Sequence, residues 1–401
     1  MTMSRILIVN KFFYKRGGDC IYAINLAHLL EQQNHEVAIF AMNFPENIKS
    51  GWECYYPYQV NFSDRQFKGK ILAISRLLGF GGIKSSFLKL LEYFKPDVVH
   101  LNNIHSYLSP IVAKLSHDRG IKVVWTLHDY KLICPTYTCL RNGKVCELCF
   151  LNPLSVLSKK CMKKSYIASF FAYIEAIRWS KNNIEPYVDT FICPSNFIAD
   201  KMIQTGYNKD KICVLCNFID FKKYNNIYKV KPKIREQAYC YIGRLSEEKG
   251  INQLLDVAKS LPYKLYVAGK GPLKDSLEKE YSYKNIIFLG ELTTDQIYNL
   301  LSTVKCSVMP SVWYENNPLS VIESLCMGTP VLGANIGGIP ELINADNGLL
   351  FAPNNPNDLR EKIVYLFNKY VFCNDKIQAT SLSKFSSENY YNKLTGIYND
   401  K

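Results

Sequence analysis

The sequence of 401 residues lacks any apolar run long enough to cross a membrane. No stretch approaches the roughly 20 uninterrupted apolar residues that a spanning helix needs. Only a short apolar run precedes Asn10 and Lys11, too short for the core of a signal peptide, so this run predicts a first buried strand. Low-complexity segments and internal repeats are also absent. We therefore expect a protein that is soluble or that binds a membrane from one side.

Acidic residues are few relative to basic ones. The chain has 35 Asp and Glu against 49 Lys and Arg, a formal net charge of +14, so we expect an anionic partner. Nucleic acid, anionic lipid and a phosphorylated substrate all qualify. The basic residues are spread along the chain except for one cluster at 159–164, and neither a helix-turn-helix nor an aromatic and basic sheet pattern is present. Nucleic-acid binding is therefore the least favoured of the three.

The 14 cysteines are diluted in a large chain that shows no secretory signal. A disulfide framework is typical of short secreted proteins, so these cysteines do not predict one. We expect reduced thiols in the cytoplasm.

Length and periodicity predict two α/β domains, because 401 residues exceed what one hydrophobic core usually serves. Short β-branched runs alternate with helical patterns from ILIV at 6–9 to KVVWTL at 122–127, and a second series runs from TFICPS at 190–195 to PVLGA at 330–334. This alternation is typical of βαβ units, and continuous apolar strands are typical of parallel sheets covered on both faces. We predict two doubly wound domains with a cleft between them, where a ligand lies beyond the carboxyl ends of the strands.

The predicted domain boundary lies near Tyr187. It leaves a first domain at 1–186, with an irregular Cys-rich loop at about 128–164, and a second domain at 187–375. A final helical segment at 376–401, with an N-cap at Ser386 or Ser387, is a candidate to pack back on the first domain.

The most informative stretch, 311–343, contains two carboxylates, Glu315 and Glu323, eight residues apart. The residues at 316–318 predict a helix start, with Asn as N-cap and Pro in the first turn. Free backbone N–H groups and the positive end of the helix dipole would face whatever Glu315 touches, which suits an anionic diphosphate. By spacing alone, two surface carboxylates on a capped helix explain the pattern equally well.

Two cations follow a predicted strand. GRLSEEKG at 243–250 places Arg244 and Lys249 between the end of a parallel strand and the next helix, where they can neutralise a leaving diphosphate in place of a metal ion. Isolated Arg and Lys side chains are otherwise commonly solvated. GKGP at 269–272 closes the following strand, and its glycines, Gly271 among them, let backbone approach a ligand or simply make a turn.

These segments, in this order and spacing, resemble the family-four retaining glycosyltransferases, the large group of GT-B type with two Rossmann-like domains (glycosyl transferases group 1). G-R-x4-K-G falls at 243–250, and E-N-N-P-L-S-V-I-E with a following G-T-P-V falls at 315–331. The resemblance covers nearly the whole chain. It implies a hexosyltransferase that moves a sugar from a nucleotide-diphosphate sugar, UDP- in preference to GDP-linked, to a saccharide or lipid-linked saccharide in cell-surface polysaccharide biosynthesis. It implies no cofactor for catalysis.

The resemblance also assigns the donor site. Arg244 and Lys249 bind the diphosphate, Glu315 faces the transferred sugar, and Glu323 binds the ribose hydroxyls. The nucleotide base lies near Gly271. The remaining donor contacts are Asn316, Asn317, Pro318, Leu319, Gly17 and Gly18. The family is usually described by front-side displacement, in which the leaving phosphate helps to deprotonate the acceptor, so the protein positions the reactants and stabilises charge.

The first half of the chain supplies a glycine pair and a histidine. Gly17 and Gly18 follow the first strand and precede a helix, the layout of a phosphate-proximal or acceptor-proximal loop. WTLHDY places His128 at the carboxyl end of a strand, where a cleft residue belongs. The resemblance makes His128 a contact to the donor sugar, and we count it with Glu315, Arg244 and Lys249 as catalytic. A lone histidine at a strand end is otherwise often structural.

The Cys-rich loop has the composition of a metal site. It contains one C-x2-C pair, and its candidate ligands are Cys134, Cys146, Cys149 and Cys161, with Cys139 as an alternative. Four thiolates could hold a structural zinc that staples a loop without a core, and relatives in the family carry similar patterns. Reduced, packed thiols are the other interpretation. Since no His or carboxylate set lies nearby, such a metal would not be catalytic.

A basic cluster of Lys159, Lys160, Lys163 and Lys164 precedes an aromatic-rich helix at 165–181. Such a face could rest on anionic lipid and receive a lipid-linked acceptor. Burial in the domain core is the interpretation that we favour for this helix. We expect a cytoplasmic protein and keep peripheral contact with the cytoplasmic face of an anionic membrane as a hypothesis.

Two other functions remain open. One is a nucleotide-sugar epimerase of the same architecture, which would give epimerised donor and no acceptor product. The other is a nucleotide-sugar-binding protein without turnover, which would bind tightly and transfer nothing. The pairing of G-R-x4-K-G with E-x7-E favours transfer.

Overall fold

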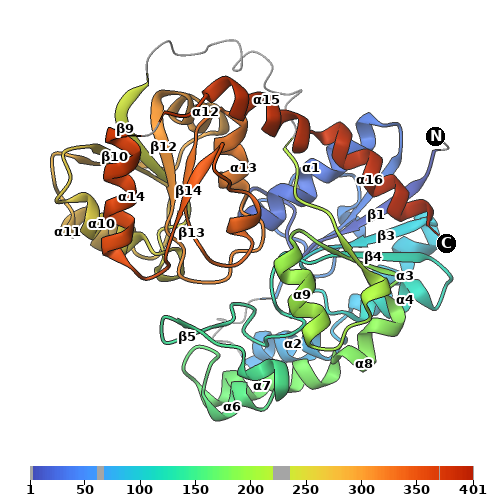
Figure 1. The fold of residues 1–401 in the computed structure, drawn as a ribbon. Coiled ribbons are helices and arrows are strands. Elements are labelled where there is room, and N and C mark those ends of the chain that lie inside the picture. The colour runs from blue at the N-terminus through green and yellow to red at the C-terminus, as the bar shows by residue number, and fades with distance from the viewer. Residues whose placement is uncertain (1–2, 61–66, 220–234, 370, 401) are drawn as a thin grey trace. The chain divides into compact units, whose positions relative to one another are not determined.

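Two parallel β-sheets, each accompanied by helices, form the two units of the protein (Figure 1). The computed structural model describes residues 3–60, 67–219, 235–369 and 371–400. The first unit comprises Met1–Cys139, Cys146–Cys216 and Tyr391–Lys401, and the second comprises Leu140–Val145 and Asn217–Tyr390. In these described ranges no helix combines the length and the apolar character that a membrane crossing requires. The predicted α/β class is confirmed.

The first sheet has the strand order β2-β1-β3-β4-β7-β8, and all neighbouring strands are parallel. Its central strands are buried along their length, which is why they appear in the sequence as continuous apolar runs. Its strands are β1 (Arg5–Val9), β2 (Glu36–Phe40), β3 (Val98–Leu101), β4 (Lys122–Thr126), β7 (Thr190–Cys193) and β8 (Ile212–Val214). The helices of this unit are α1 (Gly18–Gln32), α2 (Phe67–Leu77), α3 (Ile83–Phe94), α4 (Ile111–His117), α5 (Leu148–Leu151), α6 (Ser155–Ser158), α7 (Tyr166–Arg178), α8 (Lys181–Ile184) and α9 (Asn196–Gln204).

The division between the units lies after Cys216, not near Tyr187 as the sequence predicts. Strand β7 pairs with β4 in register, Val124 opposite Thr190, and β8 pairs with β7, so both strands extend the first sheet. A short, wholly apolar strand has the same pattern in either sheet. The sequence alone therefore could not show to which sheet β7 and β8 belong.

The end of the chain returns to the first unit. Helix α16 (Ser387–Asn399) brings Tyr398 to the buried ring of His100, where the hydroxyl lies 2.6 Å from Nδ1. The other ring nitrogen, Nε2, lies 2.8 Å from the hydroxyl of Thr126 in β4. Burial lowers the pKa of His100 to about 3, so the ring is neutral and both nitrogens have partners.

The second sheet has the strand order β11-β10-β9-β12-β13-β14, again parallel throughout. Its strands are β9 (Glu236–Ile242), β10 (Lys264–Ala268), β11 (Ile286–Gly290), β12 (Val304–Met309), β13 (Val331–Ala334) and β14 (Gly348–Phe351). The helices are α10 (Ile251–Ala258), α11 (Lys274–Glu280), α12 (Thr294–Thr303), α13 (Leu319–Cys326), α14 (Pro356–Asn368) and α15 (Asn374–Lys384). A separate antiparallel hairpin joins β5 (Leu140–Arg141) to β6 (Lys144–Val145).

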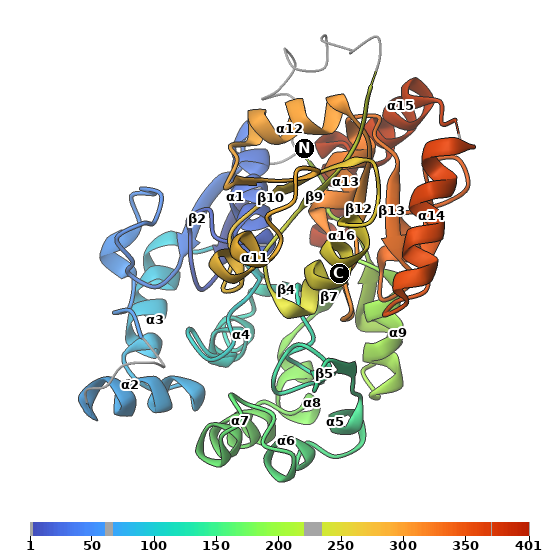
Figure 2. The same ribbon diagram turned by 90° about the vertical axis from the view of Figure 1, so that its left-hand side faces the viewer.

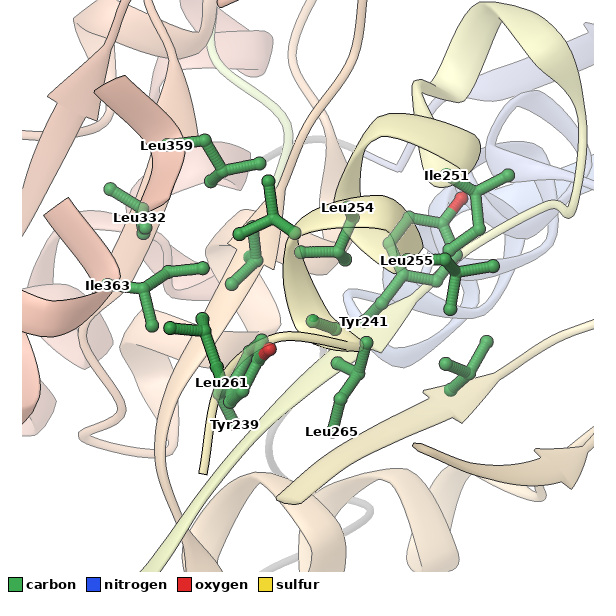
Figure 3. Close-up of a cluster of buried hydrophobic side chains, with 14 of the residues drawn as sticks. Tyr239, Tyr241, Ile251, Leu254, Leu255, Leu261, Leu265, Leu332, Leu359 and Ile363 are labelled. Carbon is green, nitrogen blue, oxygen red and sulfur yellow. The ribbon is translucent and has the colours of Figure 1, made fainter. Parts of the chain in front are cut away.

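The core of the second unit holds β9 in place (Figure 3). Helix α10 presents Ile251, Leu254 and Leu255 to this core at the i, i+3, i+4 spacing of an amphipathic helix. Leu359 and Ile363 of α14 join the same cluster. Because this packing fixes the strand that leads into GRLSEEKG, it fixes the start of the loop that carries the two predicted cations.

Arg235, immediately before β9, ties two helix ends together. Its guanidinium donates to the carbonyls of Leu301 and Val304 at 2.7 and 2.8 Å and to those of Met327 and Gly328 at 3.1 Å each. These carbonyls lie at the carboxyl ends of α12 and α13, where a cation is favourable.

We expect Arg235→Ala to lower the free energy of unfolding by about 3 kcal/mol, because the buried carbonyls lose charged donors. Urea unfolding followed by circular dichroism measures the change. Arg360→Ala is the matched control, since Arg360 is exposed and makes one side-chain hydrogen bond, to the Ser260 hydroxyl. Equal stability of the two variants would contradict the role given to Arg235.

Candidate active site

Strands β9 and β12 mark the point where the second sheet reverses its order. The chain builds outward from β9 through β10 and β11 on one side, and through β12, β13 and β14 on the other. Open α/β sheets bind ligands at the carboxyl ends of the strands at such a switch point. The loop that follows β9 holds Arg244 and Lys249, and the loop that follows β12 holds Glu315.

The carboxylate of Glu315 is the centre of a hydrogen-bond cluster. Its Oε1 atom accepts from Lys249 Nζ at 2.7 Å, from the Ser311 hydroxyl at 2.6 Å and from Trp313 Nε1 at 2.8 Å. The residue is 5% exposed. Burial alone would raise the pKa of Glu315, but the charge of Lys249 and these hydrogen bonds outweigh it and lower the pKa. Glu315 is therefore an ionised acceptor at neutral pH.

Backbone contacts lock the two loops together around this ion pair. The amide of Val312 donates to the Glu248 carbonyl at 3.1 Å. Gly250 has a φ of +68°, and a Cβ at that position would lie 1.9 Å from the Pro310 carbonyl oxygen. Only glycine permits this approach. Lys249 Nζ also lies 5.0 Å from the ring centroid of Trp313, which limits the positions that the ammonium can adopt.

The loop after β10 packs against the loop after β9. Leu245 donates its amide to the Lys270 carbonyl at 3.0 Å, and a Cβ on Gly271 would lie 2.2 Å from the Leu245 carbonyl oxygen. Gly271 is thus required by close packing of backbone on backbone. Arg244, within the same loop, is exposed, and its guanidinium has no hydrogen bond or ion pair to any residue that the structure describes.

Helix α13 begins at Leu319, with Pro318 as its N-cap residue and no side chain capping it. The prediction of an Asn N-cap is therefore wrong. Asn317 instead hydrogen-bonds Asn217. The Asn217 backbone amide donates to the Asn317 side-chain oxygen at 3.0 Å, and the Asn217 side-chain amide donates to the Asn317 carbonyl at 2.9 Å. Asn316 precedes this pair and is half-buried. An uncapped helix start leaves N–H groups that an anion can accept.

Glu323 is the fifth of the eight residues of α13. Burial raises the pKa of its carboxyl to about 7. Within the described ranges this carboxyl has no hydrogen bond or ion pair that would offset the desolvation. A carboxyl in this condition gains from any ligand that donates hydrogen bonds to its charged form.

His128 belongs to the first unit. Its Nε2 atom lies 2.9 Å from the side-chain oxygen of Asn102. Its ring packs edge to face with that of Tyr22, with 4.7 Å between the ring centroids. Burial lowers the pKa of His128 to about 4, although the Asp19 carboxylate opposes the shift. Gly17 is the N-cap residue of α1 and Gly18 its first residue. The φ of Gly17 is −164°, an extended value that other residues also adopt.

A polar cluster beside His128 was not anticipated from the sequence. Lys11 Nζ lies 3.8 Å from an Asp19 carboxylate oxygen, which also accepts from the Asn103 side chain at 2.8 Å. Burial opposes the charge on Lys11, but Asp19 and then Asp129 outweigh it and raise the Lys11 pKa. These residues follow the ends of β1, β3 and β4, and β1 and β3 form the switch point of the first sheet. In the sequence, a pair of polar residues follows each of these three buried strands, and this pattern could have indicated the cluster. In the second unit, Ser311 and Trp313 were overlooked likewise, at i−4 and i−2 from Glu315.

The predicted zinc ligands are not arranged as a metal site. In the described residues, which include the whole loop from 128 to 164, no group of three or more Cys, His, Asp or Glu side chains could hold a metal ion. Cys134 and Cys139 are buried, whereas Cys146, Cys149 and Cys161 are half-buried. None of the five forms a disulfide in the described structure. Cys134 Sγ lies 3.3 Å from the Thr136 hydroxyl inside the loop.

We expect Lys249→Ala to lower the free energy of unfolding by about 3 kcal/mol, because it leaves the buried Glu315 carboxylate without its cation. Glu315→Gln on the same background should recover much of that loss, since an amide needs no counter-ion. Urea unfolding of the wild type, both single variants and the double variant gives the coupling energy. Additive effects of the two substitutions would show that the pair is not coupled.

Comparison with sequence families gives two matches that together span most of the chain. Residues 16–223 match the family described as Glycosyltransferase Family 4, and residues 225–381 match the family Glycosyl transferases group 1. The first match covers more than half of the 401 residues.

Relatives align over most of their own length. An uncharacterised 42.6 kDa protein of the cps region of Klebsiella pneumoniae is 27% identical over 360 residues, covering 84% of this chain and 87% of the relative. The O-antigen biosynthesis glycosyltransferase WbnH of Escherichia coli is 28% identical over 327 residues, covering 79% of this chain and 82% of the relative.

Solved structures share the fold. HepE of Anabaena in complex with UDP-glucose has a TM-score of 0.66 at 18% identity, covering 98% of this chain and 99% of that chain. Sucrose-phosphate synthase of Thermosynechococcus elongatus has a TM-score of 0.71 at 17% identity, covering 98% of both chains. These similarities confirm the predicted GT-B fold of two Rossmann-like domains.

Proposed function

Because the chain belongs to glycosyltransferase family 4, we propose that it transfers a sugar from a UDP-sugar to a saccharide or lipid-linked saccharide, with retention of anomeric configuration and without a catalytic metal ion. One observation carries the proposal. Arg244 and Lys249 lie on the loop after β9, the ionised Glu315 lies on the loop after β12 and pairs with Lys249, and the uncapped start of α13 follows that second loop.

The diphosphate would bind at this edge. Arg244 is exposed and has its donors available, and Lys249 gives one of its three ammonium hydrogens to Glu315 and keeps two for phosphate oxygens. The first amides of α13 supply further donors and the positive end of the dipole. Two cations and a helix start offset the charge that develops on the leaving diphosphate, the task that a metal ion performs in other transferases.

The carboxylates would hold the sugar and the ribose. Glu315 is ionised and buried, so it can accept hydrogen bonds from sugar hydroxyls without moving. Glu323 has no charged partner among the described residues, and a ribose diol would supply two hydrogen bonds to its ionised form. Gly271 keeps the backbone after β10 close to the loop after β9, which leaves the sheet edge open to the base.

In the first unit, His128 would contact the transferred sugar as a neutral ring, because its pKa is low. Lys11, Asp19 and Asn103 offer donors and acceptors suited to the hydroxyls of a saccharide acceptor. No nucleophile is assigned. The leaving phosphate helps to deprotonate the acceptor, as front-side displacement requires.

The biological setting follows from the relatives. WbnH is named for O-antigen biosynthesis, the Klebsiella relative comes from a cps region, and HepE was solved with UDP and with UDP-glucose. These names support cell-surface polysaccharide biosynthesis as the proposed setting. A cytoplasmic location with peripheral contact to the cytoplasmic face of an anionic membrane is a further part of the proposal.

A radiolabelled UDP-sugar panel tests the activity. The proposal predicts UDP release and a labelled product in the presence of EDTA, and an anomeric coupling constant in the product that matches that of the donor. Epimerised donor without a labelled acceptor would establish the epimerase alternative instead. Tight binding without transfer would establish a binding protein.

Arg244→Ala is expected to weaken UDP-glucose binding about 10- to 100-fold, the effect of losing one charge-assisted contact. It should leave the melting temperature of the free protein unchanged, because the side chain is exposed and unpaired within the described structure. Thermal shift against UDP-glucose concentration, with EDTA present, measures both effects. Lys264→Ala, exposed at the opposite end of β10, is the control and should bind as the wild type does.

UDP-glucose affinity is expected to fall as the pH falls through about 7, because protonation of Glu323 removes an acceptor for the ribose hydroxyls. The affinity at pH 6 should be about tenfold lower than at pH 8. Calorimetric titration across this range tests the trend, and UDP-glucose has no titrating group there. Glu323→Gln should give a flat profile, whereas the exposed Glu291→Gln should keep the slope. A slope that survives Glu323→Gln would refute the assignment.

A further inference from the structure

Helix α7 buries two of its small residues and exposes three of its large apolar ones. Ser169 and Ala172 face inward, while Ile167, Phe170 and Ile177 are 72%, 46% and 45% exposed. A helix that covers the core of a water-soluble domain normally shows the opposite distribution. The interpretation favoured from the sequence, that this helix is domain core, is therefore wrong for Ile167, Phe170 and Ile177, whereas Phe171 and Ile174 are half-buried.

A buried ion pair sets this orientation. Glu175 of α7 is 3% exposed, and its carboxylate lies 2.9 Å from Lys131 Nζ. The Ser106 hydroxyl also contacts this carboxylate at 2.9 Å. Breaking a buried pair of this kind is costly, so rotation of the helix to bury its apolar face is disfavoured. The exposed apolar face is thus a fixed feature of the unit.

Four lysines adjoin this face: Lys159, Lys160, Lys163 and Lys164. All are exposed, and none forms an ion pair with a described residue. Three of them, at 160, 163 and 164, have φ values of +50° to +54°, a region that non-glycine residues seldom adopt. Lys160 Nζ lies 4.1 Å from the ring centroid of Tyr166, which is itself 57% exposed. The turn therefore holds the Lys160 ammonium beside the exposed ring of Tyr166.

Neighbouring elements extend the same surface. Helix α6 and helix α2 both pack against α7, and both views of the ribbon place the three helices at one end of the first unit (Figures 1 and 2). Next to α6, Leu151 and Leu154 are 94% and 43% exposed. This set of side chains, with the four lysines and the outer face of α7, is called the basic apolar face below.

A groove of about 500 Å³ lies in the same unit, between the loop from α2 to α3 and the end of α7. Its walls are mainly apolar, and two cations stand among them. The lining includes Leu78, Phe80, Leu88, Ile111, Lys84 and Arg178. Phe80 is 65% exposed, so the groove opens to an apolar rim.

A buried, uncompensated cation lies under the groove. Arg76 is 1% exposed and donates to the Tyr58 and Tyr107 carbonyls at 2.9 and 3.2 Å. Its Nε atom is buried without a partner, and among the described residues no carboxylate pairs with its guanidinium. That Nε atom would lie 3.0 Å from a Cβ on Gly81, a residue that lines the groove. An anion in the groove would compensate this charge.

We propose that the basic apolar face and the adjoining groove form a docking surface for an anionic phospholipid membrane. The lysines attract the charged surface, Ile167, Phe170 and Leu151 enter the interfacial region, and the groove receives a lipid phosphate at Lys84 and Arg178. This inference rests on the proposed peripheral membrane contact and is independent of sugar transfer. A lipid surface matches both halves of the feature, whereas nucleic acid or another polyanion would use the lysines and leave the aliphatic side chains in water.

Co-sedimentation of the full chain with vesicles tests the proposal. Binding is expected to vesicles of phosphatidylglycerol and phosphatidylcholine and not to phosphatidylcholine alone, because each lysine near an anionic surface strengthens partition about fivefold. The double variant Lys163→Glu with Lys164→Glu, and the double variant Ile167→Ser with Phe170→Ser, should each lower the partition coefficient at least tenfold. Lys84→Glu should lower it less.

Matched controls lie on the second unit. Lys279→Glu with Lys284→Glu removes exposed cations, and Val371→Ser removes a side chain that is 93% exposed. Both should bind vesicles as the wild type does. The UDP-glucose thermal shift of every variant, measured in parallel, separates loss of membrane binding from loss of folding or of the donor site. Equal vesicle binding by the face variants and the controls would overturn the proposal. A second result would also overturn it: binding to polyphosphate as strong as binding to vesicles, lost in the lysine double variant but kept in the variant of Ile167 and Phe170.

Discussion

The buried ion pair between Lys249 and Glu315 is the interaction that organises the second unit's site. It joins the loop after β9 to the loop after β12 across the switch point of the sheet. A carboxylate that is 5% exposed needs this cation, and the Ser311 and Trp313 donors complete its coordination. Backbone bonds from Val312 and Gly338 fix the loop on either side, so the carboxylate is in position before any donor binds. The protein bears the cost of burying a charge during folding, and catalysis then requires little reorganisation.

Most strands of both sheets were predictable from the sequence, because parallel strands buried on both faces appear as uninterrupted apolar runs. Their assignment to a sheet was not, since β7 and β8 have the same pattern whichever neighbour they pair with. The same limit applies to the site. Glu315 and Lys249 stand out by spacing, but their 2.7 Å contact joins residues 66 apart in the chain, and only the fold brings them together. The predicted N-cap residue was wrong for a local reason. Asn317 hydrogen-bonds Asn217 and therefore does not cap α13.

Helix α7 shows how one long-range contact can reverse a pattern-based inference. Its composition predicts a core helix, and its aromatic content agrees with that prediction. The Lys131–Glu175 pair, with side chains 7% and 3% exposed, instead directs the polar side of the helix inward. Burying an ion pair costs more desolvation energy than burying the same volume of hydrocarbon, so the arrangement is not explained by stability alone. The proposed membrane docking gives a functional reason for this orientation of α7, because it leaves an apolar face beside four lysines.

The arginines of this protein divide by how completely the chain satisfies them, and that division separates structural from ligand-directed charge. Arg235 donates to four carbonyls and the Thr329 hydroxyl through both of its terminal nitrogens. Arg244 is exposed and makes no side-chain hydrogen bond or ion pair with a described residue, and Arg76 is buried with its Nε unmatched. A folded chain seldom leaves a buried donor such as the Arg76 Nε unused, because burial without a partner costs free energy, whereas the exposed Arg244 is hydrated. Our two proposals give each of these cations an anionic partner: a donor diphosphate for Arg244 and a lipid phosphate in the groove above Arg76.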